Sequence, residues 1–224
     1  MIRPRGLFLT FEGSDGLGKS TALRYLSNIL CNQGIALETS REPGGTPIGE
    51  RLRTVLKDNS IPSLNHMSEL FLIFAARCQH ITSKIEPTLE NGKWLLCDRF
   101  SDATYAYQGG GRSININCIE QIEALAGIDL VPDYSFLFDA PPELGLARTI
   151  GRGKPDRFEE EDINFYNRVR EVYLDRASRD PSRWCVIDAS QSIENVEKNL
   201  AHECKRLIDN WYLSSQAENE TSLE

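Results

Sequence analysis

The chain has 224 residues, of which 40% are hydrophobic and 26% charged, a composition that fits one soluble α/β domain better than two. Its 33 acidic residues outnumber its 25 basic ones, and the formal charge of −8 argues against a nucleic-acid partner, though not against a pocket for a small phosphate ester. The N-terminal apolar run is too short for a signal peptide and no segment reaches the length of a membrane span, so we expect a cytoplasmic protein with no membrane contact.

The first part of the chain alternates between short apolar runs and helical patterns. Residues 7–11 form an apolar run that ends in a glycine-rich turn, which predicts a buried parallel strand. Helical spacing over 22–30 predicts the next helix, and residues 35–39 predict a second strand that leads into a loop of prolines and glycines. A short helix is expected over about 48–56. Apolar side chains then recur every three or four residues over 64–85, which marks one face of a long helix.

The middle of the chain repeats this alternation. Residues 94–97 predict a third strand, and the segment 101–112 that follows is polar and rich in glycine. Apolar spacing predicts a helix over 119–125. Residues 134–138 predict a fourth strand bounded by prolines, and a helix over about 142–149 leads into a basic, glycine-containing loop.

The last part of the chain supplies two more helices and a strand. Residues 163–177 and 193–211 show helical spacing, and 184–187 predict a fifth strand between them. The polar, acidic residues 214–224 are predicted to be a disordered tail. Because strands alternate with helices throughout, we expect an α/β fold with a five-stranded, mostly parallel sheet and helices on both faces. None of the six cysteines forms a CxxC pair, so no zinc site or redox pair is indicated.

A phosphate-binding loop follows the first strand. The pattern GxxxxGK[ST] is matched at every fixed position by Gly13, Ser14, Asp15, Gly16, Leu17, Gly18, Lys19 and Ser20. The loop lies between a strand and a helix, as the motif requires, so backbone N–H groups and the helix N-terminus can bind phosphate. Lys19 is expected to reach the β- and γ-phosphates of a nucleotide, and the Ser20 hydroxyl to bind Mg²⁺. A structural turn that carries a lysine by accident is the alternative, which this context disfavours.

Two arginines predict a second phosphate site. Arg41 follows the second strand and Arg99 the third, and the carboxyl ends of parallel strands face one crevice. Together they can hold the phosphate of an acceptor by bidentate hydrogen bonds. The alternative is that they pair with the neighbouring carboxylates of Glu42 and Asp98. Asp98 itself closes a strand as a Walker-B aspartate does, and either holds Mg²⁺ through water or orients Arg99.

Five segments in order resemble the motifs of the thymidylate kinases. They are FEGSDGLGKST, REPGGTPIGERLR, FAARCQH, DRFSDATYAYQGGGR and RGKPDRFE, and the resemblance extends over about residues 7–211. It implies a P-loop NTP hydrolase-type fold in which residues 1–213 are a single P-loop kinase domain. The resemblance places a short lid at about 149–159.

The resemblance also implies which residues bind the acceptor, dTMP. Phe74 would stack on thymine, although its helical spacing alone favours a core position, and Arg77 would donate to the O4 atom of the base. The full set of implied dTMP-binding residues is Asp15, Arg41, Phe74, Arg77, Arg99, Thr104, Tyr107 and Gln108. For the last three, an ordinary surface loop is the alternative. The Glu42–Pro43 peptide bond is expected to be cis.

On the donor side, the resemblance implies that ATP is bound by residues 13–20 together with Thr21 and Arg148. Some thymidylate kinases carry a catalytic arginine in the loop where this chain has Gly16, so the lid is expected to deliver it, from Arg152 or Arg157. A solvated basic loop is the alternative for the lid. The implied catalytic set is Lys19, Arg99, Arg41, Asp15, Arg152 and Arg157. Phe100 stands where the motif usually has tyrosine.

The expected activity is therefore transfer of the γ-phosphoryl group of ATP to dTMP, with Mg²⁺ as cofactor, which gives dTDP and ADP for dTTP synthesis. The resemblance implies a homodimer. Two alternatives stay open from the residues: a kinase for another nucleoside monophosphate, and a nucleotide-gated switch without catalysis, against which the intact second-site motifs argue.

Overall fold

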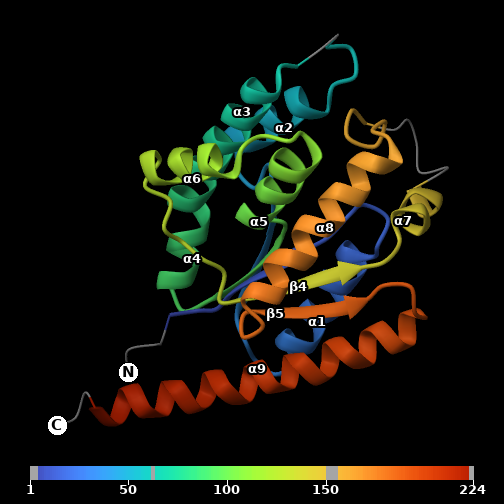
Figure 1. Ribbon diagram of the computed structural model, residues 1–224. Coiled ribbons are helices and arrows are strands. Elements are labelled where there is room, and N and C mark those ends of the chain that lie inside the picture. The colour runs from blue at the N-terminus through green and yellow to red at the C-terminus, as the bar shows by residue number, and fades with distance from the viewer. Residues whose placement is uncertain (1–4, 62–63, 150–155, 222–224) are drawn as a thin grey trace.

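The computed structural model describes residues 5–61, 64–149 and 156–221, and its elements are labelled in Figure 1. In chain order they are β1 (Phe8–Glu12), α1 (Lys19–Asn32), β2 (Leu37–Arg41), α2 (Pro47–Lys57), α3 (His66–His80), η1 (Ile81–Ile85), α4 (Glu86–Glu90), β3 (Trp94–Asp98), α5 (Ser101–Thr104), η2 (Tyr105–Gly111), α6 (Ile116–Leu125), β4 (Tyr134–Asp139), α7 (Pro142–Thr149), α8 (Ile163–Arg179), β5 (Trp184–Asp188) and α9 (Ile193–Thr221). Within the described residues, no helix combines the length and apolar character needed to cross a membrane.

The five predicted strands form one sheet in the order β2-β3-β1-β4-β5. Every pairing between them is parallel, so the prediction of a mostly parallel sheet is confirmed. The register sets Phe11 of β1 beside Asp98 of β3, and Asp98 beside Arg41 of β2. The loops that follow β1, β2 and β3 therefore leave the sheet at the same edge, where the sequence predicts both phosphate sites.

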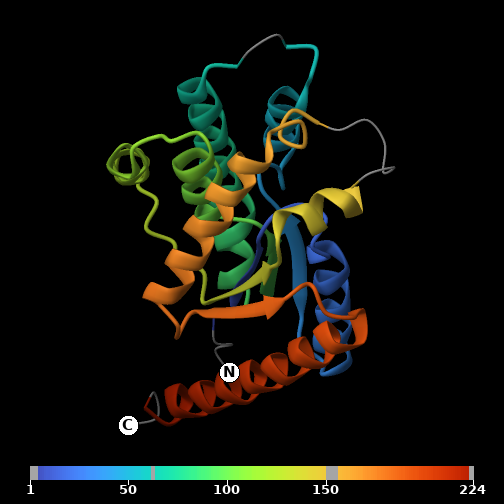
Figure 2. The same ribbon diagram turned by 45° about the vertical axis from the view of Figure 1, so that its right-hand side comes forward.

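Helices cover both faces of the sheet because the strands alternate apolar side chains between two cores. On β1, Leu9 and Phe11 are fully buried in the core that α1 and α9 complete. Phe8 points the other way and packs with Leu95, against Ile85 of η1. Figure 2 shows α1 and α9 on one side of the sheet, with α4 and α8 on the other.

The glycine-rich segment after β3 is helical, so the alternative of a surface loop at 101–112 is wrong. It forms α5 and η2, most of whose side chains are buried against α8. Gly110 and Gly111 permit this close packing. A Cβ on Gly111 would lie 2.4 Å from the ring of Phe165, and one on Gly110 would lie 2.7 Å from Val172. The polar composition of this segment suggested a loop, although the segment is helical and buried. These two glycines are needed because α8 leaves no room for a Cβ.

Two helices differ from their predicted extents. The long helix expected over 64–85 begins at His66 and becomes a π-helical turn from Ile81 to Ile85. The helix expected over 193–211 is longer than predicted, because α9 continues to Thr221. Residues 214–221 contain no glycine or proline, so nothing in the backbone ends the helix there. Residues 222–224 lie outside the described part of the chain.

Candidate functional site

The phosphate-binding loop connects β1 to α1. Its backbone has positive φ at Gly13 (118°) and Gly16 (78°), conformations that side chains rarely adopt. Space is also lacking, because a Cβ on Gly13 would lie 2.3 Å from the Phe138 carbonyl oxygen, and one on Gly16 2.1 Å from that of Gly145. No side chain caps the N-terminus of α1, so the first N–H groups of this helix remain available to an anion.

Lys19 begins α1 and lies under the loop. Its Nζ donates to the Ser14 carbonyl oxygen (2.7 Å) and lies 3.9 Å from Asp15 Oδ1. Burial lowers the pKa of Lys19 and the charge of Arg99 adds to this, while Asp15, Asp98 and Glu12 act in the opposite direction. The loop therefore holds a cation that the protein has largely withdrawn from water and that a phosphate can contact.

Arg99, at the end of β3, meets the loop at Asp15. Its Nη2 donates to Asp15 Oδ1 (2.9 Å), and its guanidinium lies 4.5 Å from the centroid of the Tyr107 ring. Withdrawal from water raises the pKa of Asp15, but the charges of Arg99 and Lys19 outweigh this and lower it to about 2. Asp15 thus stays ionised near neutral pH and joins the loop to the second arginine.

Arg41 is held at the rim of the site by Glu50 of α2. Its Nε and Nη2 donate to the two carboxylate oxygens of Glu50 (3.2 and 2.7 Å), and the side chain is 53% exposed. The alternative proposed that each strand-end arginine pairs with the carboxylate next to it in sequence, and neither does. Arg41 takes Glu50 and Arg99 takes Asp15, and both remain open to the same pocket.

That pocket, the strand-end pocket, has a volume of about 100 Å³. Its lining residues are Asp15, Arg41, Glu42, Pro43, Arg53, Lys57, Ile73, Arg77, Asp98, Arg99, Phe100, Ala103, Thr104, Tyr107, Gln108, Asp156 and Phe158. Except for Phe74, every residue that the sequence assigned to the acceptor lies here. The Glu42–Pro43 peptide bond in its wall is cis, as predicted.

Arg77 of α3 forms the inner wall of the strand-end pocket. Its Nε donates to Glu42 Oε2 (2.8 Å) and its Nη2 to Thr104 Oγ1 (2.8 Å) and the Phe100 carbonyl oxygen (3.2 Å). Its Nη1 is buried and has no hydrogen-bond partner among the described residues. His80 Nδ1 lies 2.9 Å from the other oxygen of Glu42. A buried donor without a partner indicates a place for a ligand acceptor.

Comparison with known proteins agrees with this arrangement. A sequence model of the thymidylate kinase family matches residues 11–200. The chain is 48% identical over 195 residues to a thymidylate kinase of Ectopseudomonas mendocina, which covers 87% of this chain and 93% of that one. It is 47% identical over 204 residues to a thymidylate kinase of Pseudomonas savastanoi, with 91% and 97% covered. This chain belongs to the thymidylate kinase family.

The fold agrees with that of a solved family member. The crystal structure of thymidylate kinase from Ehrlichia chaffeensis superposes with a TM-score of 0.70 at 34% identity, and the match covers 90% of this chain and 99% of that one. The P-loop kinase fold expected from the sequence is therefore shown.

Phe74, which the sequence assigned to thymine, lies beside the strand-end pocket, with its ring centroid 5.4 Å from the guanidinium carbon of Arg77, a residue that lines the pocket. It is 3% exposed, packs with Leu70, Tyr105 and Ile119, and is not among the described residues that line the strand-end pocket. Ile73 lines the pocket instead. On a helix, Ile73 lies one turn before Arg77 on the same face, whereas Phe74 is rotated toward the core. The core position that helical spacing favoured for Phe74 is the one observed.

Two residues of α2 belong to the site and were missed in the sequence. Arg53 and Lys57 both line the strand-end pocket. Arg53 Nη1 donates to the Pro43 carbonyl oxygen (2.9 Å), and burial lowers the pKa of Arg53, as do the charges of Arg41 and Arg99. Their spacing of four residues on a helix that follows the Arg41 loop was the available signal, because it places both on one face.

The remaining predicted residues lie on the outer side of the loop and in the lid. A second hollow of about 250 Å³, the outer-loop pocket, brings Thr21 and Arg148 together with Gly16, Leu17 and Gly18. Arg148 Nη1 donates to the Ala189 carbonyl oxygen (2.9 Å). Arg152 lies outside the described residues. Arg157 pairs with Glu69 Oε2 (2.7 Å) and donates to the Leu56 carbonyl oxygen (3.0 Å), so its observed partners are on α2 and α3.

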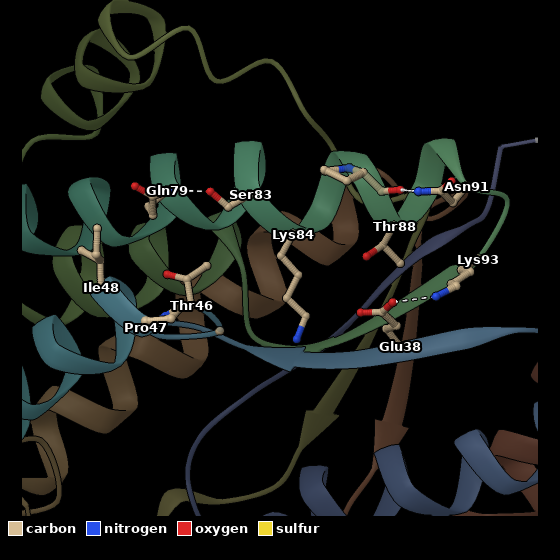
Figure 3. A pocket seen from close by; sticks show the side chains of 12 residues that line it. Glu38, Thr46, Pro47, Ile48, Gln79, Ser83, Lys84, Thr88, Asn91 and Lys93 are labelled. Carbon is tan, nitrogen blue, oxygen red and sulfur yellow. Dashed lines mark hydrogen bonds and ion pairs between the residues drawn. The ribbon is translucent and has the colours of Figure 1, made fainter.

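A third hollow of about 510 Å³, larger than the two described above, lies apart from the phosphate loop, beside the free edge of β2 (Figure 3). Lys84 reaches down from η1 and donates to the Thr39 carbonyl oxygen (3.1 Å), and Lys93 donates to Glu38 (3.0 Å). Both lysines thus bind partners within the protein, and Lys84 covers a carbonyl group on the exposed edge of the sheet. This hollow contains no residue of the loop, so size alone does not locate the site.

Proposed function

We propose that the protein transfers the γ-phosphoryl group of ATP to dTMP in the cytoplasm, where its nucleotide substrates are, and so supplies dTDP for dTTP and DNA synthesis. The observation that carries the proposal is the meeting of Lys19 and Arg99 at one carboxylate. Asp15 Oδ1 is 3.9 Å from the first cation and 2.9 Å from the second. The phosphate loop and the strand-end pocket therefore adjoin, which places a donor and an acceptor phosphate next to each other.

The chemistry needs no general base, because the acceptor phosphate already carries nucleophilic oxygens. Lys19 stabilises charge that develops on the transferred group, and Arg99, Arg41 and Arg53 hold the acceptor phosphate in line. These cations are fixed before substrate arrives, by Ser14, Asp15, Glu50 and the Pro43 carbonyl oxygen. Lid arginines, with Arg152 and Arg157 as candidates, complete the charge balance. A preformed site of this kind loses little free energy to reorganisation during the reaction.

The residues present fit Mg²⁺ bound with the nucleotide. Asp98 Oδ1 is buried without a hydrogen-bond partner in the described part of the chain, and it lines the strand-end pocket, near Lys19. Ser20 follows Lys19 at the exposed start of α1. Magnesium is usually held by one or two protein oxygens together with phosphates, which these two residues can supply. When bound, the ion neutralises negative charge on the phosphates.

The base is distinguished by two groups of opposite polarity. Arg77 Nη1 is a buried donor without a partner among the described residues. The amide nitrogen of Gln108 donates to Glu69 Oε1 (2.8 Å), which leaves its oxygen as an acceptor in the strand-end pocket. Thymine presents an O4 acceptor and an N3–H donor, whereas cytosine presents an amino donor and an N3 acceptor. The site therefore matches thymine and mismatches cytosine at both atoms.

ADP release measured with Mg·ATP and a panel of nucleoside monophosphates tests this proposal. Because each mismatched buried polar group costs about 1–3 kcal/mol, dCMP should have a kcat/KM lower than that of dTMP by about 10–100-fold or more. dUMP keeps both polar groups of thymine and should be the best of the alternatives. Equal rates with dTMP and dCMP would contradict the assignment of Arg77 and Gln108. Absence of ADP release with every monophosphate would contradict the kinase itself.

For ATP, the outer-loop pocket lies on the side of the phosphate loop away from dTMP. Thr21 and Arg148 line it together with the loop glycines. We assign the nucleoside part of ATP to this pocket, because the phosphate loop then lies between the outer-loop pocket and the strand-end pocket. Its outer side receives the nucleoside, and its inner side presents Lys19 and Asp15 to the phosphates.

We further propose that two copies of the chain associate through α2 and α3, which lie side by side in Figure 1. Three large hydrophobic side chains are exposed on these helices: Ile48 (53%), Val55 (41%) and Phe71 (56%). Phe71→Asp should convert the dimer to a monomer, because a charge there cannot be buried against a second copy. Light scattering during gel filtration measures the mass. Leu213→Asp on α9, a residue 65% exposed, is the matched control and should leave the dimer intact. A dimeric Phe71→Asp variant would contradict this interface.

A further inference from the structure

Arg99 occupies a backbone conformation that needs support. Its φ is 71°, in the left-handed region that residues other than glycine rarely enter, and such conformations persist only where surrounding contacts impose them. Two hydrogen bonds to β1 do so. The N–H of Arg99 donates to the Phe11 carbonyl oxygen (3.1 Å), and the N–H of the next residue, Phe100, donates to Glu12 Oε1 (2.9 Å). Both peptide groups that flank Arg99 are therefore fixed by the neighbouring strand.

Glu12 is itself held from the opposite side. The hydroxyl of Tyr173, on α8, donates to Glu12 Oε2 (2.9 Å). Glu12 is fully buried and Tyr173 is 1% exposed. Neither side chain is among the described residues that line the strand-end pocket. Glu12 thus connects β1, the turn after β3 and α8, one layer beneath the residues that meet the substrates.

We propose that Glu12, oriented by Tyr173, is a positioning residue that sets the backbone turn at Arg99 and thereby the place where its guanidinium meets the acceptor phosphate. This inference rests on the proposed phosphoryl transfer to dTMP. The carboxylate fixes the Phe100 N–H, this fixes the turn, and the turn directs the Arg99 side chain to Asp15 and over the Tyr107 ring.

The charges around Glu12 show which property of the side chain matters. Burial raises its pKa to about 7 and Asp102 contributes, whereas the Tyr173 hydroxyl, the charge of Arg99 and the Phe100 N–H act to lower it. In either protonation state one oxygen can still accept from Phe100. The required property is an acceptor at this atom rather than a negative charge, so glutamine is expected to replace Glu12 and methionine, of similar length, is not.

The test compares Glu12→Met with Glu12→Gln. Because a misplaced binding group weakens the positioning of one substrate, Glu12→Met should raise KM for dTMP by about 10–100-fold and change KM for ATP by less than about threefold. Glu12→Gln should stay within about threefold of the wild type for both substrates, since it keeps the acceptor. Glu203→Met removes a carboxylate that likewise accepts from a tyrosine, Tyr134 (2.9 Å), and should leave both KM values unchanged.

A structural role alone would not separate the two substrates. If Glu12→Met raises both KM values equally, or if Met and Gln behave alike, the positioning role is wrong. Should Glu12→Met fail to fold, Tyr173→Phe is judged by the same ratio of KM values, since it removes one of the two bonds that orient Glu12. A wild type that binds ATP but forms no ADP with dTMP would overturn the proposed function, and this inference with it. If the wild type is active but the variants do not change KM for dTMP differently from KM for ATP, only the inference about Glu12 is overturned.

Discussion

Replacing Lys19 with alanine is expected to lower kcat by about 10²–10³-fold, the cost of removing one preorganised donor from developing charge. The Nζ atom is fixed by the Ser14 carbonyl oxygen, and burial withdraws it from water, where its charge would be screened. Because the interaction strengthens as the phosphoryl group moves, kcat should fall more than KM for dTMP rises. Steady-state ADP release at saturating ATP and dTMP measures both values.

A matched lysine separates this effect from the loss of positive charge in general. Lys93 is 44% exposed and pairs with Glu38 at the free edge of β2, beside the hollow of about 510 Å³ (Figure 3). Exposed pairs of this kind contribute about 0–1 kcal/mol to stability, so Lys93→Ala should retain the wild-type kcat. Thermal unfolding of both variants checks that the fold is kept. A folded Lys19→Ala variant with kcat close to that of the wild type would remove Lys19 from the reaction.

Much of the fold was predictable because its central strands, β1, β3 and β4, are buried on both faces. Continuous apolar runs such as 94–97 predict a central parallel strand, and the alternation with helices then leaves few possible topologies. The segment 101–111 was not predictable in this way. Its buried helical packing depends on Gly110 and Gly111, whose small size matters only against α8, about sixty residues later in the chain. From composition alone these glycines suggest a flexible loop, whereas in the structure they allow α8 to pack closely against η2.

The site likewise contains features that the sequence predicts and features that only the packed structure shows. The phosphate loop and the two strand-end arginines were found because motif spacing and strand ends determine their location. The partners of these arginines were not predicted, because they depend on tertiary packing. Arg99 follows β3 and pairs with Asp15 in the loop after β1, and Arg41 follows β2 and pairs with Glu50 on α2. The assignment of Phe74 to the base rests on the family motif alone and stays a prediction, because a motif fixes residue order but not rotation about a helix. Only the packed helix shows that Ile73 faces the pocket.

The largest effect on stability is expected from Arg77→Met. Arg77 is 1% exposed and is the main charge facing Glu42, which is 5% exposed. Without the guanidinium, a buried carboxylate would keep only His80, and uncompensated buried charges of this kind cost about 3–5 kcal/mol of unfolding free energy. Urea unfolding at pH 7 measures this loss. Glu42→Gln combined with Arg77→Met removes the charge as well, so the double variant should be more stable than Arg77→Met alone.

The pH dependence identifies the cause of that loss. Burial raises the pKa of Glu42, but the charge of Arg77 and the hydrogen bond from His80 outweigh it, and the net pKa is lowered below the ordinary value of 4.5. A lowered pKa stabilises the fold above that ordinary value, and the contribution disappears as pH falls through the folded-state pKa. In Arg77→Met the pKa of Glu42 should rise, so the carboxylate takes up a proton as the solution is acidified. The stability deficit of the variant should therefore be greatest near pH 7 and shrink toward pH 4, at which Glu42 need no longer be charged. A deficit that stays constant between these values would assign the loss to packing of the Arg77 side chain rather than to its charge.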